Sequence, residues 1–150
     1  MIAEKSAIKL DSFSVLQSHY EFVNSKKVLK NIKALFGSYE LDFDFAHNFD
    51  DNGEIKVFVK IGVNRQKKPL PGYKLFVEAV GLFHLEDTDI PEKEQNNLKY
   101  YSTVSILIGY LRNSLAANTA SAPFGPYLLP PVDMNELFIQ KSGEVEKGND

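Results

Sequence analysis

The chain has 150 residues, of which 43% are hydrophobic and 25% charged, and its formal net charge is −3. This length and composition fit one globular domain over residues 1–150 with a core of its own. The lysines are spread out and balanced by carboxylates, so the basic stripe expected of a nucleic-acid binder is missing. The sequence has no cysteine, which excludes disulfides, thiolate nucleophiles and cysteine zinc sites.

Neither export nor membrane insertion is expected. Residues 1–10 lack a basic region followed by a long apolar run, which a secretory signal would show. The most apolar helical stretch, 104–115, is far shorter than the roughly 20 residues that span a bilayer. The sequence therefore predicts a soluble, cytoplasmic protein.

Strands are expected through the first two-thirds of the chain, because apolar and polar residues alternate there. Between residues 8 and 22, two alternating pieces are out of phase by one residue, which indicates a bulge. Further strands are expected at 38–46, 54–64 and 73–85. Residues 24–37 fit neither period and predict a loop with a short strand.

Short turns separate these strands, with Asp51-Asn52-Gly53 as a strong hairpin signal. Consecutive strands with short turns predict an antiparallel meander with one buried face. On the other face, the carboxylates of 40–44 are expected to lie across from Lys56 and Lys60, and such cross-strand pairs help to fix the register.

The last third changes to helix. Pro91 marks a helix start, and apolar residues then recur at spacings of three and four, which indicates an amphipathic helix over about 97–119. The apolar face is expected to comprise Tyr100, Val104, Leu107, Ile108, Leu111 and Leu115.

A proline-rich crossover at 122–131 follows the helix, and it must be extended because proline fixes φ and lacks the N–H. Asp133 and Glu136 have the spacing of a helix N-cap and its reciprocal partner. Gly143 is expected to end this final helix, leaving residues 143–150 as a flexible charged tail.

No catalytic or metal site is expected. A partial calcium-loop pattern over 48–53 fails because Val59 stands where a bidentate glutamate belongs. His19, His47 and His84 lack partners at ligand spacing, so structural or surface roles are favoured. The sequence also lacks a Gly-rich phosphate loop and a nucleophile-elbow serine, so neither an enzyme nor a cofactor is predicted.

Apolar residues at two places stand out. Phe58 and Phe76 lie on the charged face of the predicted sheet, and further apolar residues lie within the proline-rich crossover. Both sets either pack on their own domain or form an oligomer interface or peptide groove.

The C-terminal third resembles the SecB family of protein-export chaperones. The resemblance rests on Ile-Leu-Ile-Gly-Tyr-Leu-Arg at 106–112, Phe124, and Leu-Pro-Pro-Val-Asp-Met-Asn-Glu-Leu-Phe at 129–138. The segment 77–83 also resembles the last strand of that family.

The resemblance implies an α+β fold in which a long C-terminal helix packs on one face of a four-stranded antiparallel sheet, followed by the crossover loop and a short final helix. It implies a homotetramer, a dimer of dimers, that needs no cofactor, holds unfolded polypeptides and delivers them to the SecA motor.

The family's client groove runs between the crossover loop, the helix and the sheet. Its candidate client-binding residues here are Phe124, Tyr127, Leu128 and Leu129. Candidates for oligomer or helix packing are Val104, Leu107, Ile108, Leu111 and Leu115. Candidates for partner contact on the outer sheet face are Glu21, Phe58, Phe76 and Glu78.

Met134, Gly125 and Asp133 stand where the family has Phe, Pro and Asn, and further departures lie on the outer sheet face. Lys74 and Phe76 stand where leucine and glutamate are expected, and Gln17 replaces an acidic contact. These differences argue against SecA as a partner more than against chaperone activity. A general export holdase is thus the first hypothesis, a dedicated chaperone of one antitoxin the second, and an oligomeric scaffold without clients the third.

Overall fold

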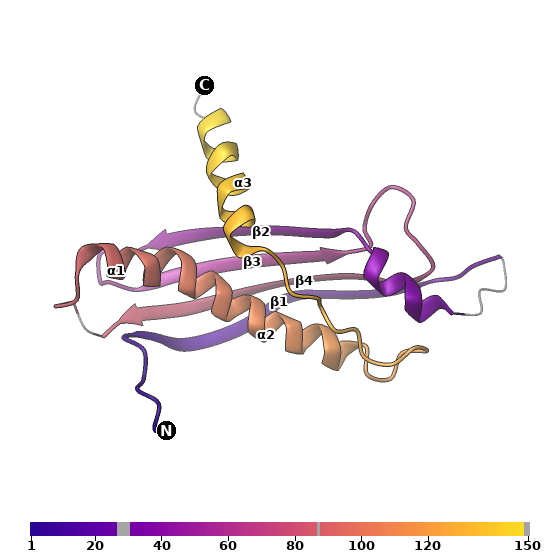
Figure 1. Cartoon of the computed structure of the whole chain (residues 1–150), viewed down its shortest axis with the longest axis horizontal. Coiled ribbons are helices and arrows are strands. Elements are labelled where there is room, and N and C mark those ends of the chain that lie inside the picture. Colours follow the sequence, from indigo (N-terminus) through magenta and orange to yellow (C-terminus); the bar gives the residue numbers. More distant parts are fainter. Residues whose placement is uncertain (27–30, 87, 149–150) are drawn as a thin grey trace.

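Four antiparallel strands form the sheet of the computed structural model, which describes residues 1–26, 31–86 and 88–148 (Figure 1). The strands are β1 (Ile8–Val23), β2 (Leu41–Phe49), β3 (Ile55–Val63) and β4 (Gly72–Leu85). Their order is β1-β4-β3-β2, so only β2, β3 and β4 form the predicted meander. β1 pairs with β4 instead, because a long connection, not a tight turn, joins β1 to β2.

That connection contains a 3₁₀ helix, η1 (Ile32–Ser38), where the sequence predicted a short strand. The Asn31 side chain caps η1 by accepting a hydrogen bond from the Ala34 N–H at 3.2 Å. Part of the connection, residues 27–30, lies outside the described residues.

The predicted bulge in β1 is confirmed. Pairing with β4 shifts register between Leu10 and Ser12, which leaves Asp11 as the extra residue. A second shift lies between Val15 and Gln17 and was not predicted. The two bulges let one long strand follow the twist of β4 along its full length.

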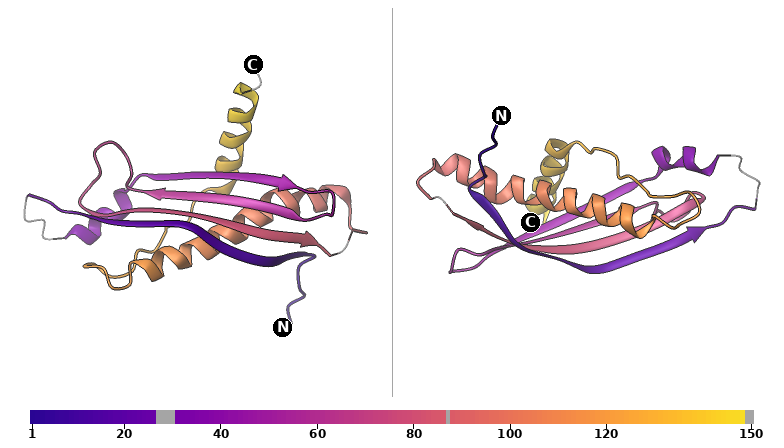
Figure 2. Two further views of the ribbon diagram at one scale, coloured as in Figure 1. Left: turned by 180° about the vertical axis from the view of Figure 1, so that it is seen from behind. Right: turned by 90° about the horizontal axis from the view of Figure 1, so that it is seen from below.

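A continuous helical stretch covers one face of the sheet. It comprises α1 (Glu92–Asn97), the π-helical turn η2 (Leu98–Ser102) and α2 (Thr103–Asn118). Figure 2 shows from below that this layer lies on one side of the sheet and leaves the other side open. The predicted amphipathic helix is confirmed, and its start at Pro91 extends it by one further turn.

The core lies between α2 and the sheet, where the inward faces of β3 and β4 are almost fully buried. α2 comes close to β4 at Gly81: a Cβ built there would lie 2.6 Å from Leu107 Cδ2 and 2.8 Å from Phe83 Cε2. Only glycine therefore lets the helix approach the sheet this closely.

The crossover segment, residues 119–133, runs back beside α2, on the same face of the sheet, to the last helix (Figures 1 and 2). Tyr73 from β4 anchors it with two hydrogen bonds: its hydroxyl accepts from the Phe124 N–H at 2.7 Å and donates to the Gly125 carbonyl at 2.8 Å. Thr119 Oγ1 accepts from the Tyr127 N–H at 2.7 Å. The crossover segment is thus tied to the domain despite its four prolines.

The final helix, α3 (Met134–Lys147), is longer than predicted. Asp133 caps it as expected, accepting from the Glu136 N–H at 3.0 Å. Gly143 lies within α3 and does not end it, because one glycine weakens a helix by only about 1 kcal/mol. Much of the expected tail is therefore helical, and α3 rises beyond β2, away from the sheet (Figure 1).

Candidate functional site

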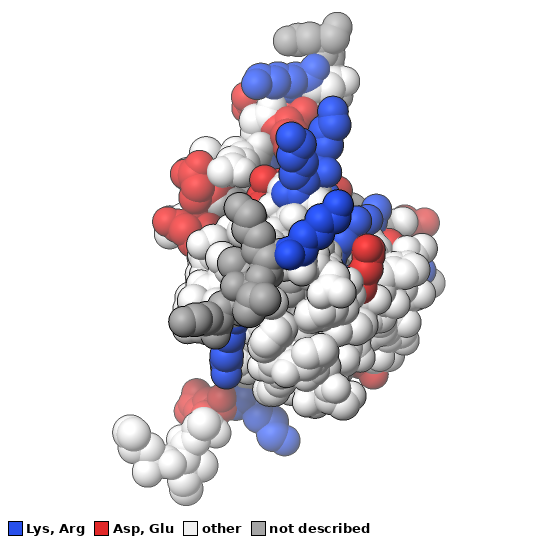
Figure 3. All heavy atoms as spheres, turned by 90° about the vertical axis from the view of Figure 1, so that its right-hand side faces the viewer, with Lys and Arg blue, Asp and Glu red and all other residues white. Residues whose placement is uncertain are grey.

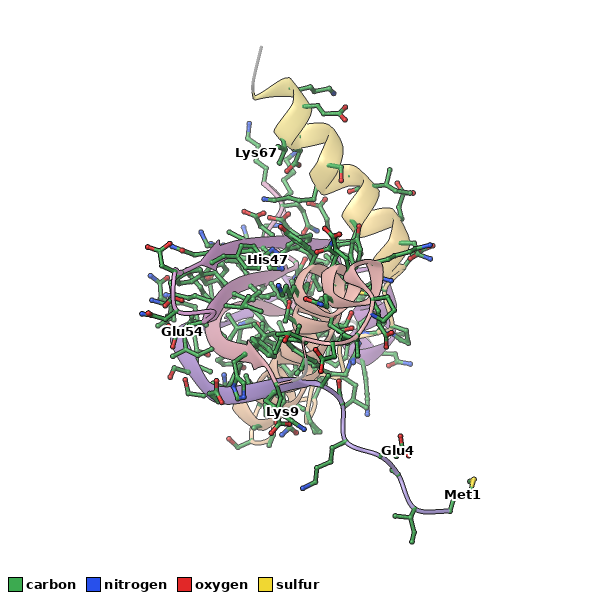
Figure 4. The ribbon with its side chains drawn as sticks, turned by 90° about the vertical axis from the view of Figure 1, so that its left-hand side faces the viewer. Met1, Glu4, Lys9, His47, Glu54 and Lys67 are labelled. Carbon is green, nitrogen blue, oxygen red and sulfur yellow. The ribbon has the colours of Figure 1, made fainter. Side chains whose placement is uncertain are left out.

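An aromatic groove opens where β2, η2 and α3 meet, with a cavity of about 560 Å³. Its lining residues are Phe45, Ala46, His47, Tyr100, Tyr101, Phe138, Lys141, Ser142, Val145 and Glu146. This set of residues is called the aromatic groove below. Figure 4 labels His47 beneath the foot of α3. The volume falls within the range typical of ligand sites, which are mostly apolar with a few polar groups.

The π-helical turn η2 supplies two tyrosines to the groove. An α-helical period would place Tyr100 on the buried face with Val104, but the wider turn adds a residue and rotates the preceding side chains. Tyr100 and Tyr101 are consequently 44% and 47% exposed. Tyr100 packs its ring against His47, with the ring centroids 5.5 Å apart.

α3 forms the other wall through Phe138 and Lys141. The Phe138 ring meets Tyr101 edge-on at 4.6 Å between centroids and Phe45 at 5.3 Å. Lys141 Nζ lies 2.6 Å from Asp44 Oδ1 and 5.6 Å above the centre of the Phe45 ring. A few contacts at the start of α3 therefore hold it on the edge strand, while Ile139 and Val145 stay exposed.

The pKa of His47, a titratable group of this groove, is shifted from its ordinary value. Burial lowers its pKa below 6.5, a hydrogen bond with the Tyr100 backbone raises it, and the positive charge of Lys141 lowers it again. The net shift is downward. His47 is therefore neutral at pH 7, and its ring stacks on Phe49 at 5.9 Å between centroids.

The crossover segment offers a second surface, and this one is uncharged. Residues 113–132 contain no Lys, Arg, Asp or Glu. Figure 3 faces the end of the molecule to which this segment belongs and shows a broad area without charged side chains below a group of basic ones. Aromatic and proline side chains at this end thus adjoin solvent without charges among them.

Known proteins resemble this chain in sequence and in fold. Residues 4–144 match the family of the preprotein translocase subunit SecB. The chain belongs to the SecB family. The family is one of chaperones, not of enzymes, and membership supports a chaperone role for the chain.

Two relatives and one solved structure are similar to the chain. An uncharacterized protein of Methanocaldococcus jannaschii is 26% identical over 147 residues, covering 97% of this chain and 90% of that protein. The protein-export protein SecB of Anaplasma phagocytophilum is 26% identical over 94 residues, covering 62% and 60%. A SecB-like chaperone of Mycobacterium tuberculosis, solved with a ChAD peptide from the HigA1 antitoxin, has the same fold, with a TM-score of 0.57 at 17% identity over 84% of this chain and 91% of that one.

The SecB-like crossover does not present all four of its predicted client-binding residues. Leu128 is 71% exposed and Phe124 half-buried, whereas Tyr127 and Leu129 are 1% and 2% exposed and belong to the core. Arg112 helps to hold Leu129 inward by donating a hydrogen bond from Nε to its carbonyl at 3.0 Å. In this conformation, Leu128 and Phe124 are the members of the set that a partner can reach.

Tyr127 carries an unusual polar atom. Its hydroxyl is buried without a hydrogen-bond partner among the described residues. Burial raises the pKa of Tyr127 to about 12, so the phenol stays protonated. The aromatic ring packs beside Phe36 and Tyr39, at 5.5 and 6.1 Å between centroids, and these contacts keep it in place.

On the outer face of the SecB-like sheet, the predicted partner residues separate into two pairs. Phe58 and Glu78 border one hollow of about 260 Å³, and Glu21 and Phe76 border another of about 300 Å³. In the second hollow the Arg65 guanidinium lies 4.5 Å above the Phe76 ring centre. In the same hollow, Glu21 forms an ion pair with Lys74, at 3.7 Å.

The register of β2 and β3 corrects the predicted charge pairing on that face. Asp44 lies opposite Lys60, as expected, but forms its ion pair with Lys141 of α3. Lys56 lies opposite Asn48 instead of a carboxylate.

The five helix residues named from the sequence all lie inside the SecB-like domain, where α2 packs on the sheet. These residues are Val104, Leu107, Ile108, Leu111 and Leu115, and the side chain of each is at most 3% exposed. They contribute to the core within one protomer, and their side chains are not available to another subunit.

Sequence reasoning missed most of the aromatic groove. Tyr100 was expected on the buried helix face, while Phe45, Tyr101 and Lys141 were not singled out. The paired tyrosines, followed by a helix in a new phase, were the one available sign of the π turn.

Within the described ranges, no group of three or more His, Asp or Glu side chains is placed to hold a metal ion. None of the helices in these ranges combines the length and apolar character needed to cross a bilayer. The aromatic groove is instead suited to holding apolar side chains of another polypeptide.

Proposed function

We propose that this SecB-family chain is an ATP-independent holdase that binds unfolded polypeptides in the cytoplasm and keeps them competent for export. Family membership carries the coarse assignment. The aromatic groove supports the finer one, because it joins aromatic walls to a cavity of about 560 Å³ open to solvent. We further propose that it works as the family's dimer of dimers.

The physical argument is that a holdase must accept many sequences. Rigid aromatic side chains offer large contact areas and lose little conformational entropy on binding. Tyr100, Tyr101 and Phe138 supply such surfaces, and exposed Leu128 in the crossover segment provides another apolar contact. The groove has few charges, so desolvating it costs little. Release without nucleotide requires only that the client be handed on.

A dedicated chaperone for one antitoxin is the second candidate. The structural neighbour from Mycobacterium tuberculosis was solved with an antitoxin peptide. One part of the outer face favours it: Lys74 pairs with Glu21, and Arg65 covers Phe76, so these two predicted contacts for a motor are already engaged within the chain. Under this reading the clients are few and one polypeptide co-purifies with the chain.

Light scattering tests the proposal. A chemically unfolded, aggregating protein is diluted into buffer with and without this chain, in the absence of nucleotide. Suppression near stoichiometric amounts is expected from a holdase. Aggregation that continues unchanged at a large excess of the chain rules out a general holdase and leaves the dedicated chaperone, for which a single co-purifying partner is then sought.

A further inference from the structure

Basic side chains gather at the end of the sheet where β1 finishes and β3 turns back into β4. The described residues of 22–39 and 61–77, which form this end, include six basic residues and no Asp or Glu. They are Lys26, Lys33, Arg65, Lys67, Lys68 and Lys74. Because the whole chain has a net charge of −3, the remaining residues together carry −9. Positive charge is therefore concentrated at one end of an acidic chain.

Four of these lysines have charges that the chain leaves uncompensated. Lys26, Lys33, Lys67 and Lys68 are exposed, and within residues 1–26, 31–86 and 88–148 none of them forms an ion pair. The other two basic residues are engaged on the outer sheet face, as described above. The four free lysines are called the basic end below. Uncompensated like charges on one part of a surface attract an anionic partner.

The connection between β3 and β4, which contains Lys67 and Lys68, is held in one shape by Asn64. This residue is fully buried and has a φ of 57°, which asparagine tolerates better than most residues. Its side-chain amide donates to the Leu70 and Tyr73 carbonyls, at 2.8 and 2.9 Å, and its Oδ1 accepts from the Leu70 N–H at 2.8 Å. The two lysines are thus presented by a fixed loop.

Hydrogen bonds join this connection to η1, which contains Lys33, and to the crossover segment. The Tyr39 hydroxyl, just after η1, donates to the Pro71 carbonyl at 2.8 Å and accepts from the Tyr73 N–H at 3.0 Å. The Tyr73 hydroxyl in turn anchors the crossover segment. Figure 1 shows η1, the β3–β4 connection and the tip of the crossover at the same end of the molecule, and Figure 4 labels Lys67. The basic end and the crossover segment therefore form one platform.

The uncharged surface of the crossover segment adjoins the basic end. Residues 113–132 contain no charged side chain, and Leu128 within them is 71% exposed. Figure 3 shows the broad uncharged area next to the group of basic side chains. An extended anionic surface that contacts the lysines would therefore meet no carboxylates in this neighbouring area, and no ionic group would be desolvated there.

The chemistry of the basic end favours lipid headgroups over nucleic acid. Its free charges are all lysines, which act as point charges, whereas nucleic-acid recognition draws on the planar fork of arginine. The aromatic rings at this end are packed on one another: Phe22 lies 5.9 Å from Phe124, and Phe36 lies 5.5 Å from Tyr127, between centroids. They are thus not free to stack on bases, as single-stranded nucleic acids require. Lysine clusters beside apolar residues are typical of attachment to anionic membranes.

We propose that the basic end attaches the chain to the surface of an anionic phospholipid membrane, with its four lysines on the headgroups and the uncharged crossover surface beside them. The attachment is peripheral and electrostatic. Each lysine near such a surface contributes about fivefold in affinity, and salt screens the interaction. The aromatic groove includes none of these four lysines, so attachment and client binding can occur together.

Co-sedimentation with vesicles tests the proposal. Vesicles of phosphatidylcholine are compared with vesicles that also contain phosphatidylglycerol, and the chain should bind only the second kind, less strongly as salt is raised. Lys67→Gln with Lys68→Gln should weaken this binding about 25-fold. The matched control is Lys5→Gln with Lys93→Gln, which removes the same charge from two exposed lysines outside the basic end and should change affinity less than about twofold.

The proposal is overturned by any of four results: no binding to the anionic vesicles, equal binding to both kinds of vesicle, equal loss in the two double variants, or binding of a single-stranded RNA homopolymer without binding of the anionic vesicles. Light scattering with an unfolded protein is run on the parent and on the Lys67/Lys68 variant. Equal suppression by both shows that the variant is folded and that client binding is separate. Suppression together with any of the four results refutes membrane attachment and leaves the holdase standing, whereas vesicle binding without suppression refutes the holdase alone.

Discussion

Two buried tyrosines differ in whether their hydroxyl group forms hydrogen bonds. Tyr73 and Tyr127 are 0% and 1% exposed. The Tyr73 hydroxyl makes two hydrogen bonds to the crossover segment, at 2.7 and 2.8 Å. The Tyr127 hydroxyl makes none with the described residues. Replacing each by phenylalanine removes the same atom from two equally buried sites.

The two replacements should change stability in opposite directions. Tyr73→Phe leaves the Phe124 N–H and the Gly125 carbonyl without partners, which costs about 1–3 kcal/mol in the free energy of unfolding. Tyr127→Phe removes a hydroxyl that was desolvated without compensation, so the expected change lies between zero and a gain of about 1–2 kcal/mol. The variants should therefore differ by at least about 1 kcal/mol.

Urea unfolding followed by circular dichroism measures this difference. Both variants and the parent chain are compared at one protein concentration, because association would shift the apparent stability. An unchanged slope with denaturant confirms that the variants unfold from similarly compact states. If Tyr127→Phe loses as much stability as Tyr73→Phe, the Tyr127 hydroxyl has a partner and the reasoning about it fails.

Three further predictions concern the core and the groove. Leu107→Asp or Leu111→Asp should lower the melting temperature severely, because each buries an unpaired charge; unchanged melting of either would remove that residue from the core. Gly81→Ala should lower the free energy of unfolding by about 1–3 kcal/mol through overpacking. Gly109→Ala, on an open face of α2, should raise it by about 0.5–1 kcal/mol. Equal effects of the two variants in denaturant titrations would contradict the close approach of α2 to the sheet. Because the pKa of His47 is lowered from 6.5 in the folded chain, the unfolded chain binds more protons than the folded chain as pH falls below 6.5, and the folded chain should lose stability with falling pH. A His47→Gln variant should lack this part of the pH dependence in melting curves recorded from pH 7.5 to 5. An identical pH dependence of the variant and the parent would exclude His47 as its source.

The sequence predicted those parts of the fold that depend on local periodicity. Alternation located the sheet strands, and a one-residue phase change located the bulge at Asp11. Spacings of three and four located α2 and its buried face. These signals suffice because side-chain direction repeats every two residues in a strand and every 3.6 in a helix.

The parts that it did not predict depend on long-range or irregular geometry. The pairing of β1 with β4 follows from how a long connection closes, which no local pattern encodes. The π turn shifts the helical phase between Tyr100 and Thr103, so periodic reasoning buried a tyrosine that the structure exposes. α3 continues through Gly143, since one glycine is a weak stop signal.

The candidate site shows the same division. Apolar residues in the crossover segment were visible in the sequence, but which of them face solvent depends on the anchors supplied by Tyr73, Thr119 and Arg112. The aromatic groove assembles residues about 90 positions apart, from β2 to α3, so its existence could not be predicted from spacing. The family resemblance identified the class of protein, and the structure was needed to locate the cavity.

Binding of a permanently unfolded, fluorescently labelled polypeptide, followed by anisotropy, tests the central claim that the aromatic groove holds clients. The informative variant is Tyr100→Ser with Tyr101→Ser, and the matched control is Tyr110→Ser, a tyrosine of the same helical layer that is 49% exposed and lies outside the groove. Native mass and melting temperature are recorded for each. The groove variant should raise Kd at least about tenfold while the control stays near the parent value. Equal Kd values for the parent, the groove variant and the control, with all three folded and of equal mass, would contradict the account.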